Sequence, residues 1–353
     1  MLAPLAALVA SLLPAAGVPA RAVEAPVPCR GAQVVLLAPL SGAAARVGRE
    51  HEAWARAALT AYRTSPRVAV ELVVADTAQD PARAEAAAAR AAAAPRTAAV
   101  VGARTSGEAL AAAVPLAAAS LPLVSATASA TALADGRLAT FFRVVPNDDA
   151  QALRIARLLA ETVGARQVLV VDDGTVDSRP LAAALARRLQ ALAIGVERAT
   201  AGAEEAAALA GPQTDAVVAA WKAPARVQAL ARLLREHGKR AAVVGAAGLA
   251  SPGEVTAEGA YLVAPVPEPR ALAGVPGVEG PAVFAAVRAA VNALGNACRD
   301  GSATRGEMVT WVRRTYLRPT PLGRPLAFDG RGQPRAAAWS VLQVRGGRYA
   351  PVR

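Results

Sequence analysis

The chain has 353 residues, more than one compact core usually holds, so we expect two domains. Hydrophobic residues make up 54% of it but aromatic residues only 3%, which predicts a large core of small side chains. The net charge is +12, yet the basic residues are spread along the chain, with no run of five or six of them and no basic stretch interleaved with aromatics. Because nucleic-acid binding needs clustered charge, we expect no nucleic-acid partner.

The N-terminus has the pattern of a secretory signal. Residues 2–18 are apolar and uncharged, and Val18-Pro19-Ala20 places small residues where a signal peptidase cleaves. The apolar stretch is too short to span a bilayer comfortably. We therefore predict a signal peptide over residues 1–20, with cleavage after Ala22 as the alternative, and a periplasmic mature protein. No later segment has 18 consecutive apolar residues, so we expect no downstream transmembrane helix.

Strands and helices alternate along the first half of the mature chain. Apolar runs predict strands at 33–40, 68–75, 98–102, 121–125 and 141–145, and helical spacing predicts helices at 47–63, from Pro81 and from Ser106. Asp80-Pro81 is typical of a helix start, with Asp as N-cap and Pro at the first helical position.

The same alternation begins again after residue 149. Helices are predicted at 150–163, 179–192 and 225–237, and strands at 167–171, 216–220 and 241–245. A Pro- and Gly-rich connection over 265–280 precedes helices at 281–298 and 305–316 and strand-like segments at 325–329 and 337–344. This order predicts an α/β protein with two doubly wound parallel-sheet lobes and a ligand cleft beyond the carboxyl ends of the strands.

Cysteine and histidine usage limits the chemistry. Cys29 and Cys298 permit one disulfide in an oxidising compartment, or remain two unrelated thiols. His51 and His237 are far apart in sequence, and no Cys/His cluster exists, so we expect no metal site and no cofactor. The chain also lacks a G-x-S-x-G elbow, a Walker loop and a G-x-G-x-x-G opening a helix after the first strand, so we expect no enzymatic activity.

Several short motifs carry a family resemblance, and they run in order through nearly the whole mature chain. They are Leu40-Ser41-Gly42 followed by Gly48, the segments 76–81 (DTAQDP) and 142–151 (FRVVPNDDAQ), Glu258-Gly259, and Gly323 followed by 328–332 (FDGRG). In this order the chain resembles the type I periplasmic binding fold, closest to the leucine/isoleucine/valine-binding branch of ABC-transporter substrate-binding proteins.

The resemblance implies two lobes that are not contiguous in sequence. Lobe 1 would comprise residues 29–147 plus 269–325, and lobe 2 residues 148–268 plus 326–353, joined by a multi-strand hinge. On this division Cys29 and Cys298 share a lobe, which makes a bridge between them geometrically possible. The family captures a small molecule by lobe closure and delivers it to the membrane permease of an ABC importer. We expect the same here, with the chain acting as a monomer.

The resemblance also implies ligand-binding positions. Ser106, Thr127 (through its backbone) and Ser129 match the family's residues for a ligand carboxylate, and a helix N-terminus suits that charge. The alternative is that both serines are plain N-caps. Ala247 stands where the family has an acidic residue for the ligand's ammonium. Without that acid, either Asp177 or Asp173 supplies the charge, or the ligand carries no ammonium.

Trp221 and Lys222 follow a predicted strand of lobe 2. Together they offer a stacking face and a cation, which would suit a carboxylic acid without an amine. The alternative is a surface loop pair. The ligand therefore stays open between an amino acid and a related organic acid or amide. A ligand-sensing protein of the same fold that reports to a membrane receptor is the alternative function.

Overall fold

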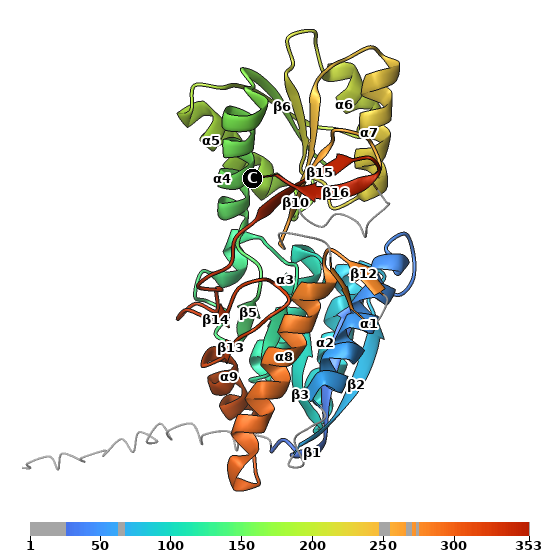
Figure 1. Cartoon of the computed structure of the whole chain (residues 1–353). Coiled ribbons are helices and arrows are strands. Elements are labelled where there is room, and N and C mark those ends of the chain that lie inside the picture. The colour runs from blue at the N-terminus through green and yellow to red at the C-terminus, as the bar shows by residue number, and fades with distance from the viewer. Residues whose placement is uncertain (1–25, 63–67, 247–254, 266–269, 273–274, 353) are drawn as a thin grey trace, which may run out of the picture.

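The computed structural model describes residues 26–62, 68–246, 255–265, 270–272 and 275–352. The predicted signal peptide at 1–20 lies outside the described residues, and so does Ala247. The described chain forms two lobes, one above the other (Figure 1).

Lobe 1 is built on a parallel five-stranded sheet in the order β2-β1-β3-β4-β5. Side chains alternate between the two faces of a strand, so one strand serves two layers of core. In β1, Val34 and Leu36 belong to one hydrophobic cluster and Val35 and Leu37 to another. The strands are β1 (Arg30–Ala38), β2 (Ala69–Asp76), β3 (Thr97–Val101), β4 (Leu123–Ser125) and β5 (Phe141–Arg143).

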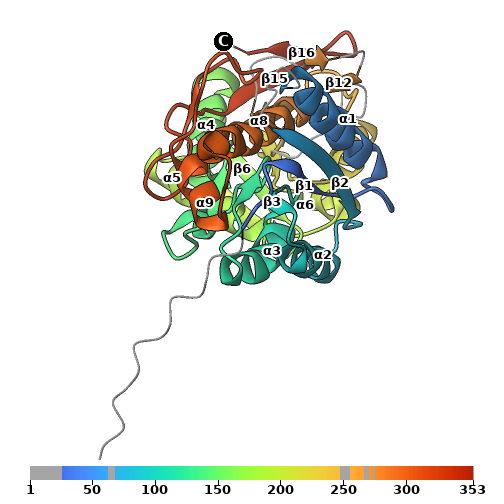
Figure 2. The same cartoon turned by 90° about the horizontal axis from the view of Figure 1, so that it is seen from below.

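Helices cover both faces of this sheet, as Figure 2 shows from below. One face carries α1 (Ala45–Tyr62), α8 (Gly280–Ala297) and α9 (Arg305–Arg313), and the other carries α2 (Pro81–Ala93) and α3 (Ser106–Ala118). The start of α2 is as predicted, because the Asp80 carboxylate accepts a hydrogen bond from the Arg83 amide and Pro81 occupies the first turn.

Lobe 2 is built on a seven-stranded sheet in the order β16-β15-β10-β9-β8-β6-β7. Val168 and Val170 of β6 pack toward α4 and α5, and Leu169 and Val171 pack toward α6 and α7. The strands are β6 (Gln167–Asp172), β7 (Gly195–Thr200), β8 (Ala216–Ala219), β9 (Ala242–Gly245), β10 (Tyr261–Ala264), β15 (Ser340–Arg345) and β16 (Arg348–Pro351). The helices are α4 (Asp148–Arg157), α5 (Arg179–Ala191), α6 (Ala203–Leu209) and α7 (Pro224–Glu236).

Short elements connect the lobes and end the helices. They are η1 (Thr131–Ala134), the π-helical turn η2 (Leu158–Val163), η3 (Cys298–Asp300), the hairpin of β11 (Arg270–Leu272) with β12 (Val275–Gly277), and the pair β13 (Tyr316–Leu317) and β14 (Leu326–Ala327). The two-lobed α/β fold predicted from the sequence is confirmed.

The segment after residue 325 is placed differently from the predicted lobe boundary. β14 pairs with β13, and the Arg143 amide of β5 donates to the Gly332 carbonyl. The Phe328 ring lies 5.3 Å from the Phe142 ring, centroid to centroid. These contacts hold residues 326–334 against lobe 1 before the chain enters β15 of lobe 2.

Cys29 and Cys298 form a disulfide, which confirms that option. It joins the segment before β1 to the end of α8, so both ends of the bridge belong to lobe 1. None of the described helices is long and apolar enough to cross a membrane.

Candidate functional site

The loop between β3 and α3 sets the position of the first site residues. Gly102 has φ +111°, and a Cβ there would lie 2.4 Å from the Leu37 carbonyl oxygen, so only glycine lets the chain turn at this point. Thr105 is the N-cap of α3, and its side chain exchanges hydrogen bonds with Glu108 in a capping box. Ser106 is therefore the first residue of the helix rather than its cap.

The first two amides of α3 bind a carboxylate that comes from the opposite lobe. Asp177 lies in the loop between β6 and α5, and its Oδ1 accepts a hydrogen bond from Ser106 N at 2.5 Å. Its Oδ2 accepts from Gly107 N at 3.3 Å. Unpaired amides and the helix dipole make a helix N-terminus favourable for an anion. The interlobe contact thus fills the predicted carboxylate position with a side chain of the protein itself.

Lys222 completes this contact with a positive charge. It follows β8, and its Nζ lies 3.3 Å from Asp177 Oδ1 and 3.3 Å from the Thr127 carbonyl oxygen. Both side chains of the pair are largely buried, at 7% and 12% exposure. Burial on its own would raise the pKa of Asp177, but Lys222 and the two α3 amides outweigh it, and the net shift is downward.

Thr127 and Ser129 lie in the loop after β4, the strand next to β3. The Thr127 hydroxyl donates to the Arg104 carbonyl at 2.7 Å, which ties this loop to the start of α3. The Ser106 hydroxyl accepts from the Ala130 amide at 3.1 Å. Ser129 does not cap a helix, because η1 begins two residues later and Ala130 precedes it. The reading of Ser106 and Ser129 as plain N-caps is therefore wrong.

Asp148 is a buried carboxylate beside this loop that the sequence did not single out as a site residue. It is 1% exposed, and neither carboxylate oxygen has a hydrogen-bond partner of standard geometry among the described residues. Burial raises the pKa of Asp148, while Ser129, Lys222 and Arg143 lower it to a smaller extent. Its backbone amide donates to the Ser129 carbonyl at 2.8 Å, so α4 of lobe 2 begins directly against the Ser129 loop.

A polar network shapes the loop that carries Asp177. The Asp173 carboxylate accepts hydrogen bonds from the hydroxyls of Thr175 and Ser178. Its other oxygen lies 3.2 Å from Arg226 Nη1. The Arg226 guanidinium lies 4.4 Å from the centre of the Trp221 ring. Asp173 therefore serves its own loop, and Asp177 reaches across to lobe 1.

Trp221 is buried within lobe 2. Its exposed fraction is 0%, and it belongs to the hydrophobic cluster of β6, β8, α6 and α7. Arg226 covers one face of its ring. Trp221 thus packs inside the lobe in this structure. Lys222 beside it is mostly buried, pairs with Asp177 of the same lobe and donates to the Thr127 carbonyl of lobe 1, so the reading of the two residues as a surface loop pair does not describe this structure.

Beneath the loop before α3, lobe 1 contains a buried ionic cluster. The Arg104 guanidinium binds both oxygens of Glu279, and His51 Nε2 lies 2.8 Å from Glu279 Oε2. Arg104 also donates to Gln79 at 2.8 Å. Arg104 is two residues before Ser106, so the cluster fixes the backbone from which α3 starts. Its members are up to 228 residues apart in sequence, and no local pattern predicts their meeting.

The site residues from the two lobes face each other at the carboxyl ends of neighbouring strands. Ser106, Thr127 and Ser129 follow β3 and β4, whereas Asp177 and Lys222 follow β6 and β8. Ala247 lies outside the described residues, so its predicted position is not placed. Within the described part of the chain, no group of three or more His, Cys, Asp or Glu side chains is placed to hold a metal ion.

Comparison with known proteins identifies the family. The model of the periplasmic binding protein family matches residues 32–347, so the chain belongs to that family. The family consists of small-molecule-binding receptors of ABC transporters that work in the periplasm or outside the cell. No curated protein matches the chain in sequence.

Solved structures share the fold at low sequence identity. A leucine-binding protein from Thermotoga maritima has a TM-score of 0.81 and 20% identity, over 91% of this chain and 98% of that one. A branched-chain amino-acid transporter substrate-binding protein from Streptococcus pneumoniae, solved with isoleucine, has a TM-score of 0.77 and 18% identity over 91% and 98%. An ABC-transporter solute-binding protein from R. palustris, solved with benzoate, has a TM-score of 0.76 and 15% identity over 91% and 95%.

Proposed function

We propose that the chain is a receptor that captures a small carboxylate-bearing solute between its lobes and delivers it to the permease of an ABC importer. The observation that carries this proposal is the pair of α3 amides, Ser106 N and Gly107 N, which hold a carboxylate at the interlobe contact. A site that binds the carboxylate of Asp177 has the geometry and the dipole to bind that of a free solute.

The lining of the proposed site comes from both lobes. Ser106, Thr127 and Ser129 present hydroxyl and backbone groups from lobe 1, and Lys222 presents a cation from lobe 2. Asp177 is an acidic residue of lobe 2 in direct contact with these groups, and Trp221 and Ala247 stay members of the proposed set only as sequence predictions. The chain would act as a monomer without catalysis, since binding and release are all that delivery requires.

The ligands of two similar solved structures suggest a range for the ligand class. The solved structures include one with isoleucine and one with benzoate, so this fold accepts carboxylates with and without an ammonium group. For this chain we propose an amino acid or a related organic acid or amide. The Lys222 ammonium favours a ligand with a negatively charged carboxylate over the corresponding amide.

A thermal-shift screen tests the proposal. A solute that binds only the folded state raises the melting temperature, by an amount set by its concentration relative to Kd. The panel contains amino acids, aliphatic acids, aromatic acids and the matching amides, each applied to the refolded mature protein. We expect at least one carboxylate to raise the melting temperature in a dose-dependent way. A rise with uncharged solutes alone would contradict the proposed ligand class.

A further inference from the structure

The ion pair of Asp177 and Lys222 occupies the points on lobe 1 that the cleft offers to a charged ligand. Two amides of α3 bind the Asp177 carboxylate, and the Thr127 carbonyl binds the Lys222 ammonium. The two charged groups contact each other at 3.3 Å, so they resemble a solute with adjacent negative and positive groups. Both side chains come from lobe 2. The backbone groups of Ser106, Gly107 and Thr127 that bind them come from lobe 1.

The surrounding packing is fitted to this contact. A Cβ on Gly107 would lie 3.1 Å from Val176 Cγ2 and 3.6 Å from Asp177 Oδ2, so the loop of lobe 2 lies close against the first turn of α3. The same loop is shaped internally by Asp173 and held from behind by Arg226. Asp177 is therefore presented in a fixed orientation, which lowers the entropic cost of forming the contact.

We infer that Asp177 and Lys222 form an internal latch, which holds the two lobes together before any solute binds and which a carboxylate solute must displace. That the latch holds the lobes together stands on the interlobe contact alone. That a carboxylate solute displaces it rests on the proposed function. On this account the latch competes with the ligand. The measured association constant equals the intrinsic association constant multiplied by the fraction of molecules that have the latch open.

Hydrogen bonds to a charged group are roughly twice as strong as neutral ones. The two α3 amides that bind the Asp177 carboxylate and the Thr127 carbonyl that binds Lys222 are therefore the contacts that favour the closed arrangement, whereas the Asp177–Lys222 ion pair lies within lobe 2. Arg104 and Asp148 also face the pair electrostatically, the first from lobe 1 and the second from the start of α4. Arg104 attracts the Asp177 carboxylate, whereas Asp148 is attracted to Lys222 and repelled by Asp177.

The first test needs no ligand. The mature protein is unfolded in guanidinium and refolded to remove any bound solute, and its radius of gyration is measured by small-angle X-ray scattering. Hydrogen exchange of the Ser106 and Gly107 amides is measured alongside. We expect Asp177→Ala and Lys222→Met to increase the radius of gyration relative to the wild type, and we expect Asp177→Ala to speed exchange at both amides at least about tenfold.

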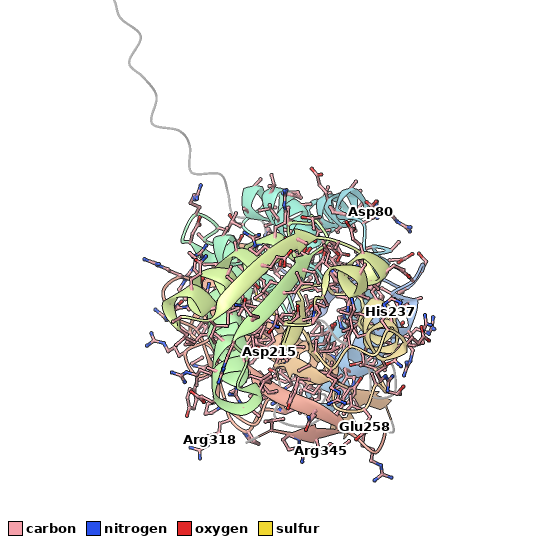
Figure 3. All side chains as sticks on the ribbon, turned by 90° about the horizontal axis from the view of Figure 1, so that it is seen from above. Asp80, Asp215, His237, Glu258, Arg318 and Arg345 are labelled. Carbon is pink, nitrogen blue, oxygen red and sulfur yellow. A yellow bond between two sulfur atoms is a disulfide. The ribbon has the colours of Figure 1, made fainter. Side chains whose placement is uncertain are left out.

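Asp80→Asn is the matched control. Asp80 is also a carboxylate that binds a backbone amide, that of Arg83, at a helix start, but it caps α2 within lobe 1 and lies at the outer edge of the molecule (Figure 3). It should leave the radius of gyration unchanged. Identical scattering for wild type and Asp177→Ala, or an equal increase in Asp80→Asn, would overturn the latch. Circular dichroism on each variant verifies folding, and Lys222→Met is the second route if Asp177→Ala does not fold.

The second test adds L-leucine and, separately, benzoate in a calorimeter. If either binds the wild type, Asp177→Ala should bind it about tenfold more tightly, because the internal competitor is gone. Weaker binding by Asp177→Ala would overturn displacement and assign Asp177 to direct ligand contact. Absence of binding to every variant would count against the proposed ligand class, while the scattering result would still decide whether the latch exists.

Discussion

The Arg104 guanidinium binds both carboxylate oxygens of Glu279 inside lobe 1, with Nε at 3.2 Å from Oε2 and Nη2 at 3.1 Å from Oε1. Glu279 immediately precedes α8, and Arg104 lies in the loop that leads into α3. The pair therefore connects the start of α8, where the chain has returned to lobe 1, to the loop before α3. The first amides of α3 form the candidate site.

Glu279→Gln should destabilise the protein by about 3–5 kcal/mol, because it leaves the buried Arg104 cation without its counter-charge. Urea unfolding followed by circular dichroism measures the loss. Glu236→Gln is the control, because Glu236 pairs with Arg232 on an exposed helix face. This substitution should lower the free energy of unfolding by less than about 0.5 kcal/mol. A Glu279→Gln variant as stable as the control would contradict the role given to this pair.

Acid should weaken the same cluster. Burial by itself would raise the pKa of Glu279, but Arg104 and His51 outweigh it and lower the pKa from 4.5 to about 2. A carboxylate with a depressed pKa contributes stability that is fully present above pH 4.5 and is lost as the pH falls toward about 2. The contribution amounts to about 3 kcal/mol.

The free energy of unfolding, measured between about pH 5 and about pH 3, should fall less steeply in Glu279→Gln than in the wild type. The comparison between the two proteins is needed because other carboxylates titrate in the same window, and the pKa of Asp76 is also lowered to about 2. Parallel curves for the two proteins would show that Glu279 is protonated normally in the folded state.

Replacing Cys29 and Cys298 together by serine should cost about 2–5 kcal/mol of stability. The bridge joins residues 269 positions apart, and in the chain-entropy account a long loop gives a large effect. Because both ends belong to lobe 1, the loss should appear as earlier exchange of lobe 1 amides, with lobe 2 amides little changed. An unchanged melting temperature after complete reduction would contradict this prediction.

Gly107→Leu should keep the lobes apart. A side chain at this position would occupy the space of Val176 and Asp177, whereas Leu is well accommodated in the first turn of a helix. We expect a larger radius of gyration with little change in the secondary structure of either lobe. Gly211→Leu is the control, since a Cβ at Gly211 meets no atom within 4 Å. Equal scattering by both variants would mean that the close approach at Gly107 is not required for closure.

Most of the β-α order was predictable, because buried parallel strands are apolar runs and their helices carry caps. β7 was missed, since Gly195–Thr200 at the sheet edge has only exposed and half-buried residues and lacks an apolar run. The predicted helix at 150–163 is α4 followed by a π-helical turn. The predicted start of α3 at Ser106 is confirmed, but the alternative with Ser106 as its N-cap was one residue late, although Thr105 followed by Glu108 has the spacing of a capping box.

The meeting of Ser106 with the loop of Thr127 and Ser129 could be expected from sequence, because strand ends in such sheets are where helix N-termini gather, and the structure brings them together. That they bind a ligand carboxylate stays a prediction. The contact of Asp177 with the α3 amides could not be expected, since Ser106 and Asp177 are 71 residues apart and lie in different lobes. Asp148 was equally invisible as a site residue, because its burial comes from the meeting of α4 with the Ser129 loop. Contacts made only by tertiary packing leave no local pattern.

Isothermal titration calorimetry with matched acids and amides tests the central claim most directly. L-leucine is compared with L-leucinamide and benzoate with benzamide, on the refolded mature protein. A carboxylate that binds at the α3 amides should bind at least about tenfold more tightly than its amide, because a charge-assisted hydrogen bond contributes about 1.5–3 kcal/mol. Equal affinity for an acid and its amide would contradict a carboxylate site between the lobes.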